Sequence, residues 1–169
     1  MKQNVLCFRY TKDMPYFLKE DIEALEWTIG QTIAKLKDVG GELRDAVTQS
    51  SETWHDNFPF ENAQQQARLL EQRLKDLEKI RRNATVVDGP TNNDTVSMGH
   101  TVTVRNVDTG EVREYRIGSH VTFVKDTLSY ASPIGALLLG TKRSQHVRGT
   151  IAGKECEFEI IDIQTRINE

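Results

Sequence analysis

Apolar residues in the first half of the chain recur at alternating steps of four and three positions. Two segments carry this spacing, one from Leu18 to Val47 and one from Phe60 to Leu77. Such a narrow heptad seam is typical of long helices packed mainly on each other, because a helix on a globular core has a wider apolar stripe. The short connection between the two segments predicts an antiparallel coiled-coil hairpin. Its first helix would rise by about 45 Å at ~1.5 Å per residue.

The second half of the chain alternates apolar and polar residues with a period of two. The runs 100–105 and 155–160 show this most clearly, and 108–110 and 152–154 have the composition of hairpin turns. Between them, the segment 132–140 begins with Ser-Pro and ends with Gly, which predicts a short capped helix. A small antiparallel sheet with one short helix, following a helical hairpin, makes an α+β fold.

Glycine divides the chain unevenly, with three residues in 1–88 and eight in 89–169. The polar stretch between the two halves has the composition of a linker. We therefore expect a coiled-coil hairpin over 12–86, a linker over 87–95 and a sheet domain over 96–166.

Composition excludes several classes of protein. The formal net charge of −3 is unlike that of a nucleic-acid-coating protein, and no apolar run approaches the ~18 residues of a membrane span. The N-terminal segment lacks the apolar centre of a signal peptide, and Cys7 and Cys156 stand far apart without a metal or redox motif. We expect a soluble, cytoplasmic monomer that is not associated with a membrane.

The connection between the two predicted helices holds the candidate chemistry. The chain has no glycine-rich phosphate loop, His/Cys cluster or nucleophile elbow, so we do not expect an enzyme in its own right. Glu52 and Asp56 are four residues apart in this connection and would project from the end of the hairpin. Carboxylates are hard ligands that suit Mg²⁺, although one or two of them would only complete a metal site supplied by a partner.

A simpler interpretation of the same residues is structural. Asp56 or Asn57 stands just before Pro59 and would cap the second helix, and on spacing alone this is the preferred interpretation. Trp54 and the phenylalanines near it would pack across the turn, or would anchor the tip in another molecule.

Residues 129–140 read S-Y-A-S-P-I-G-A-L-L-L-G and are similar to the pattern S-x-x-S-P-[IL]-[GA]-x-A-L-[IL]-G. Together with four other segments, they resemble the bacterial GreA/GreB family of transcript-cleavage factors, and this motif is the most specific of the five. The resemblance extends from about residue 12 to 164. The other four segments are similar to the opening hairpin of the family's C-terminal domain, its closing strand and the end of its second helix: 99–104, 106–111, 157–163 and 73–78.

The resemblance implies a fold and a function. The coiled coil would enter the secondary channel of bacterial RNA polymerase, and an FKBP-like C-terminal domain would bind the rim of the channel. Acidic residues at the tip would help to bind a Mg²⁺ ion shared with the polymerase active site, the factor having no cofactor of its own. The polymerase would then hydrolyse the 3′ end of its own backtracked RNA.

The family's tip pattern, G-D-L-x-E-N-A-E-Y, aligns without gaps to residues 52–60. The second family acid falls on Asp56, but the first falls on Thr53, which has no carboxylate. Its neighbour Glu52 is the substitute, which makes Asp56 and Glu52 the predicted catalytic and metal-binding residues. A gapped alternative uses 61–63 as the E-N-A of the pattern and lengthens the tip.

The resemblance assigns the other candidate residues as well. Trp54, His55 and Asn57 complete the tip, and a polymerase-docking surface is expected at the start of the short helix: Ser132, Pro133 and Ile134.

Two other functions compete with cleavage. The substitution at Thr53 and the bulk of Trp54 favour a related channel-binding regulator or inhibitor that does not stimulate cleavage. An FKBP-like shape alone would suggest a prolyl isomerase or chaperone, although the second half has few aromatic residues to line a proline pocket.

Overall fold

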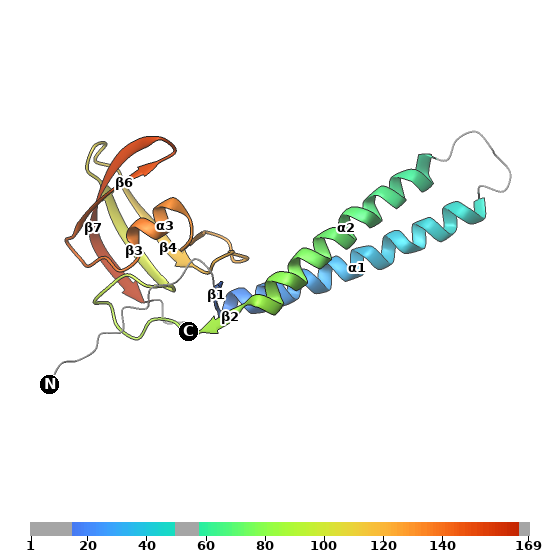
Figure 1. Ribbon diagram of the computed structural model, residues 1–169, viewed down its shortest axis with the longest axis horizontal. Helices are drawn as coiled ribbons and strands as arrows, with labels where there is room; N and C mark the ends of the chain where they lie inside the picture. The colour runs from blue at the N-terminus through green and yellow to red at the C-terminus, as the bar shows by residue number, and fades with distance from the viewer. Residues whose placement is uncertain (1–14, 50–57, 166–169) are drawn as a thin grey trace. The chain divides into compact units, whose positions relative to one another are not determined.

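The computed structural model describes residues 15–49 and 58–165, and contacts divide the chain into two compact units (Figure 1). The helical unit is Glu23–Asn83, and the sheet unit comprises the described residues before Glu23 and after Asn83. The domain bounds 12–86, 87–95 and 96–166 stay a prediction.

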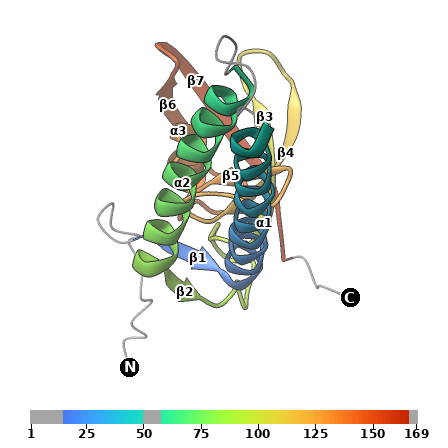
Figure 2. The same ribbon diagram turned by 90° about the vertical axis from the view of Figure 1, so that its right-hand side faces the viewer.

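Two long helices, α1 (Lys19–Gln49) and α2 (Phe58–Asn83), form the antiparallel hairpin that the sequence predicts (Figures 1 and 2). The heptad seam is confirmed over most of its length. Two of its positions differ, because Leu18 lies in a strand and Val47 is 59% exposed. Its most deeply buried helical positions are Leu25, Ile29, Thr32, Val39, Ala63 and Leu77.

The strand β1 (Tyr16–Leu18) precedes α1, and the strand β2 (Thr85–Val87) follows α2. The two strands pair in parallel, and Phe17 in β1 is fully buried. The sequence did not predict this small sheet, since three residues are too few to establish a period of two.

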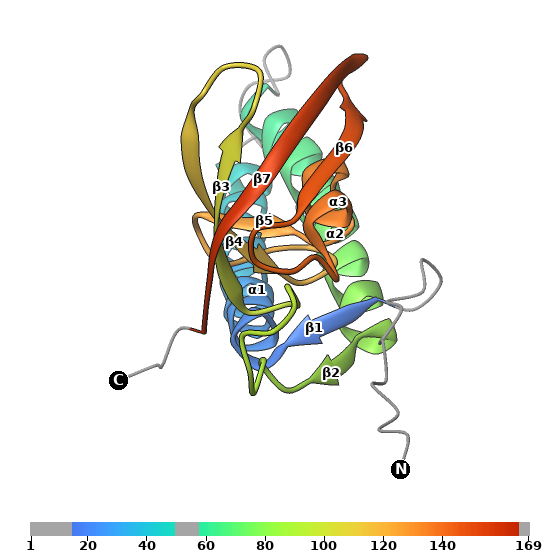
Figure 3. The ribbon, with the colours of Figure 1, turned by 90° about the vertical axis from the view of Figure 1, so that its left-hand side faces the viewer.

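The larger sheet has the strand order β5-β4-β3-β7-β6, and Figure 3 shows β7 running across it. Every pair is antiparallel except β4–β5, and the α+β class is confirmed. The helix α3 (Pro133–Leu138) packs against β6. The strands are β3 (His100–Asn106), β4 (Val112–Gly118), β5 (Thr127–Ser129), β6 (His146–Ile151) and β7 (Lys154–Thr165).

A β-bulge in β7 determines which of its residues face the core. Val102 pairs with Ile163 and Val104 with Ile160, so Ile161 is the extra residue between them. The bulge allows Ile160 and Ile163, which are three positions apart, to be fully buried on the same face.

Candidate functional site

The predicted catalytic and metal-binding residues lie at the far end of the hairpin in sequence. α1 ends at Gln49 and α2 begins at Phe58, so Glu52 and Asp56 fall in the segment 50–57, outside the described residues. The predicted tip residues Trp54, His55 and Asn57 fall in the same segment.

Two residues in the first turn of α2 are exposed. Phe58, its first residue, is 70% exposed, and Glu61 is exposed on the same turn. Glu61 is the acid that the gapped register would use, whereas Ala63 in that register is buried in the hairpin seam. The two registers therefore remain alternatives that can be separated by substitution.

The three predicted docking residues stand together at the start of α3. The Ser132 hydroxyl accepts a hydrogen bond from the Gly135 amide (3.1 Å) and donates one to the Ser129 carbonyl (2.7 Å). Ser132 is therefore the N-cap that the sequence predicted, and its polar group is used inside the domain. Pro133 is exposed, and Ile134 is half-buried against the core.

Close packing fixes the shape of this helix start. A Cβ atom at Gly135 would lie 2.1 Å from the Ser129 carbonyl oxygen, a distance that no side chain can adopt. On the other side of α3, a Cβ atom at Gly149 would meet the Leu137 side chain at 3.0 Å. The glycines thus allow α3 to lie directly on the sheet, with Pro133 presented at its exposed end.

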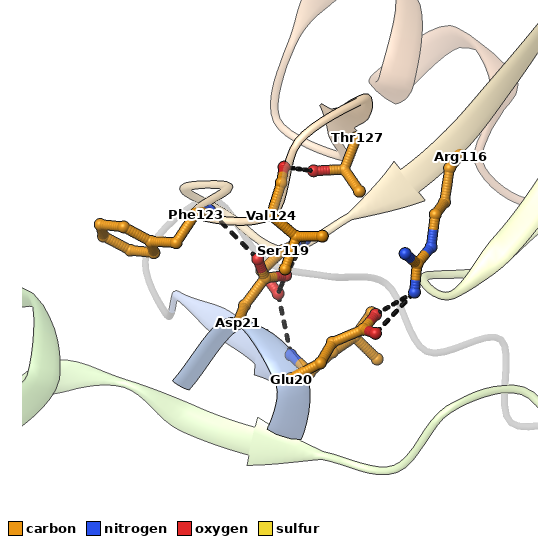
Figure 4. Close-up of polar contacts among 8 residues, drawn as sticks. Glu20, Asp21, Arg116, Ser119, Phe123, Val124 and Thr127 are labelled. Carbon is orange, nitrogen blue, oxygen red and sulfur yellow. Dashed lines mark hydrogen bonds and ion pairs between the residues drawn. The ribbon is translucent and has the colours of Figure 1, made fainter. Parts of the chain in front are cut away.

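A second polar site lies at the base of α1, within the sheet unit (Figure 4). Asp21 is only 1% exposed, and its carboxylate accepts hydrogen bonds on both oxygens. Oδ1 accepts from the Phe123 amide (3.1 Å), and Oδ2 accepts from both the Ser119 amide (3.3 Å) and the Ser119 hydroxyl. The Ser119 hydroxyl oxygen in turn accepts from the Leu18 amide at 2.8 Å. These contacts join the first turn of α1 to residues 119–126, which we call the anchor loop.

The neighbouring residue Glu20 makes a separate ion pair with the same side of the sheet unit. Arg116 Nη2 on β4 lies 2.5 and 2.6 Å from the two Glu20 carboxylate oxygens. The Arg116 side chain is 15% exposed and that of Glu20 is 30% exposed, so solvent screens this pair only in part. The first turn of α1 is thus held by two adjacent carboxylates.

The anchor loop has further internal contacts. The Thr127 hydroxyl donates to the Val124 carbonyl at 2.7 Å and closes the end of the loop (Figure 4). Asp126 has φ 58°, in the left-handed region that aspartate tolerates better than most residues. The His120 amide donates to the Tyr16 carbonyl at 3.1 Å, which joins the loop to β1 as well.

Sequence reasoning missed Asp21, although the chain carries a signal for it. Asp21 is three positions after Leu18 and four before Leu25, so it shares the buried face of the seam. An acid on that face, where leucine or isoleucine is expected, indicates a buried and hydrogen-bonded carboxylate.

His100, at the start of β3, is another buried polar residue. Its Nδ1 accepts from the Ser97 amide (3.0 Å), which requires Nε2 to carry the proton that is donated to the Asn92 carbonyl (2.8 Å). Burial lowers the pKa of His100, and the bond to Asn92 opposes this shift. The neutral ring therefore fixes the segment that precedes the sheet.

Within residues 15–49 and 58–165, no group of three His, Cys, Asp or Glu side chains could hold a metal ion. In the same ranges, no helix has the length and apolar character that a transmembrane span needs.

Comparison with known proteins gives one family match and several whole-length relatives. A model described as "Transcription elongation factor, GreA/GreB, C-term" matches residues 91–165. Transcription elongation factor GreA of Thermotoga neapolitana is 28% identical over 160 residues, covering 94% of this chain and 97% of that protein. Transcription elongation factor GreA of Helicobacter acinonychis is 32% identical over 111 residues, covering 64% and 68%.

Among solved structures, GreA factor homolog 1 (Gfh1) of Thermus thermophilus aligns with 21% identity and a TM-score of 0.41. The alignment covers 89% of this chain and 99% of that chain.

Proposed function

Because the chain belongs to the GreA/GreB family of transcription elongation factors, we propose that it binds bacterial RNA polymerase and promotes cleavage of backtracked RNA. The chain would act through the polymerase, which performs the hydrolysis, rather than as an enzyme alone. The hairpin would enter the secondary channel, and the sheet unit would bind the channel rim.

One observation carries the cleavage proposal. α1 is a continuous helix of 31 residues, about 45 Å long, and the segment that follows it holds two carboxylates, Glu52 and Asp56. A helical hairpin of this length suits a narrow channel, with the acids carried at its end.

Asp56 and Glu52 would hold a Mg²⁺ ion together with ligands of the polymerase. The donor set fits, since carboxylate oxygens are hard ligands and Mg²⁺ takes only one or two protein carboxylates at most sites. When bound, the ion stabilises the charges on the attacking and leaving oxygens. His55, Asn57 and Trp54 would surround the RNA 3′ end beside these acids.

Docking would use the exposed start of α3. Pro133 and Ile134 would contact the polymerase rim, while Ser132, whose hydroxyl is bonded internally, would shape the surface from within.

The test uses a stalled, backtracked elongation complex of the cognate polymerase with 3′-labelled RNA. Wild-type protein should release short labelled fragments. Asp56→Ala should slow their release by about 10²-fold, the usual effect of removing one group that stabilises the transition state, and should leave polymerase binding nearly intact. Glu52→Ala should have a similar effect.

Glu61→Ala is the matched control, because Glu61 is an exposed acid close to the tip. In the gapless register it should keep cleavage, whereas the gapped register would make it the inactive variant. If wild-type protein binds the polymerase and releases no fragments, the cleavage proposal is wrong and the factor regulates the channel by occupying it.

A further inference from the structure

We propose that Asp21 is a positioning residue for transcript cleavage, and that its buried carboxylate acts by fixing the first turn of α1 to the anchor loop. The inference rests on the proposed function and extends it to a residue that lies at the opposite end of α1 from the tip. It concerns this chain's own contacts within the sheet unit.

The first step of the argument is the cost of burying the charge. A carboxylate at 1% exposure loses nearly all of its hydration, and this burial is tolerated only where hydrogen bonds replace the water. Here two backbone amides and one hydroxyl do so, and the N-terminal turn of a helix also favours a negative charge. An apolar side chain would fill this place on the seam at lower cost.

The second step is directional. Apolar packing permits sliding and rotation, whereas a carboxylate held on both oxygens allows one arrangement of the first turn against the loop. Ser119 adds to this constraint, since its hydroxyl bonds Asp21 and the Leu18 amide together. The ion pair between Glu20 and Arg116 of β4 holds the same turn at a second point. With two points of attachment, the first turn of α1 cannot rotate about one contact without breaking the other.

The third step is the length of the helix that begins there. α1 continues without a break from Lys19 to Gln49. If the first turn could rock by about 10°, the far end of a helix of ~45 Å would move by roughly 8 Å. Misplacement of reacting groups by about 1 Å can cost 10²-fold in rate, so a loosely held base would reduce cleavage even with an intact tip.

Asp21→Asn tests this inference, because it keeps the shape of the side chain and removes its charge and one acceptor. At saturating factor, we expect the maximum rate of RNA cleavage to fall by about tenfold or more. The factor concentration that gives half of this maximum should change by less than about threefold, because docking residues are untouched. Glu26→Gln, an exposed acid on the next turn of α1, is the matched control and should change neither quantity.

A positive result can be strengthened by chemical rescue. Asp21→Ala would leave the Ser119 and Phe123 donors facing a space the size of a carboxylate. Added formate should restore part of the maximum cleavage rate in this variant and should have no effect on wild-type protein.

Hydrogen exchange gives a measurement that does not depend on cleavage. In Asp21→Asn, the amides of residues 19–25 and 119–125 should exchange at least about tenfold faster, while α2 and β7 keep their protection. If the whole chain of this variant unfolds, Ser119→Ala, which removes only the hydroxyl donor, should give smaller changes in the same direction.

The outcomes separate the two proposals. If wild-type protein cleaves and Asp21→Asn cleaves equally fast at saturation, or loses activity only through weaker binding, the positioning role is overturned and the proposed function stands. Unchanged exchange in residues 19–25 would also overturn it. If wild-type protein does not cleave, the proposed function fails, and the positioning role fails with it.

Discussion

The helical unit and the sheet unit use glycine differently. At Gly40, in the middle of α1, an added Cβ atom would meet nothing within 4 Å among the described residues beyond its own stretch of helix. At Gly135, in α3, the same atom would lie 2.1 Å from the Ser129 carbonyl oxygen. The hairpin is held by a narrow seam that leaves most positions open, whereas α3 in the sheet unit lies so close to Ser129 that Gly135 has no room for a side chain. Substitution by alanine should therefore have opposite effects at Gly40 and at Gly135.

Gly135→Ala should have the largest effect on stability. The clash with the Ser129 carbonyl oxygen forces α3 away from the end of β5, and we expect a loss of about 3 kcal/mol in the free energy of unfolding of the sheet unit. Faster hydrogen exchange in α3 and β6, with α2 unchanged, would show it.

Gly140→Ala is the control for this substitution, since Gly140 has φ 75° but its Cβ would meet no atom within 4 Å. Backbone strain alone should then cost about 1 kcal/mol. Equal losses in the two variants would contradict the role of the close contact at Gly135.

Ser132→Ala should come next. It removes the N-cap of α3 and the bond to the Ser129 carbonyl, at a cost of about 1–2 kcal/mol in the free energy of unfolding. Ser132→Thr keeps a hydroxyl and should retain most of the stability. Chemical denaturation of both variants would check this, and a Thr variant as unstable as the Ala variant would argue against capping.

In the helical unit, Gly40→Ala should raise stability. Alanine has a higher helix propensity than glycine by about 1 kcal/mol, and the open space at Gly40 leaves room for its methyl group. Gly41→Ala should add a similar amount. Slower hydrogen exchange in the middle of α1 would show the gain. A loss of stability would contradict this expectation, because it would mean that a side chain at Gly40 or Gly41 disturbs the helix despite the open space around both positions.

The smallest expected effect is a pH dependence confined to the sheet unit. Burial lowers the pKa of His100, so the unfolded chain takes up a proton more readily than the folded one. The contribution of His100 to stability should be complete above its ordinary pKa of about 6.5 and should decline as the pH falls below that value. In His100→Gln, the free energy of unfolding should decline less steeply as the pH is lowered from about 7 to 5, as measured by chemical denaturation. An unchanged slope would mean that other groups cause the decline.

The regular elements of this fold were predictable from local patterns. The heptad spacing predicted both long helices because it persists over many turns. Ser132 and Pro133 predicted α3 because capping is a local interaction. Val47 was expected in the seam but is 59% exposed, since its burial depends on a partner helix and not on spacing alone.

The contacts between distant segments were not predictable in this way. Asp21 meets Ser119 and Phe123 across about a hundred positions of sequence, and the pairing of β1 with β2 has no local signal. The tip acids Glu52 and Asp56 were inferred from their spacing and from family resemblance, and their role stays a prediction.

The bulge at Ile161 has a consequence for insertions and deletions in this chain. Glu157 and Glu159 pair with outward-facing residues before the bulge, and Asp162 does so after it, although its number has the opposite parity. Deleting Ile161 would restore a regular ladder in which Ile160 and Ile163 still face the core and Asp162 still faces outward, because their partners on β3 are consecutive. The strand should therefore tolerate the removal of Ile161, whereas a further residue inserted beside it would exchange the inward-facing and outward-facing positions on one side of the bulge.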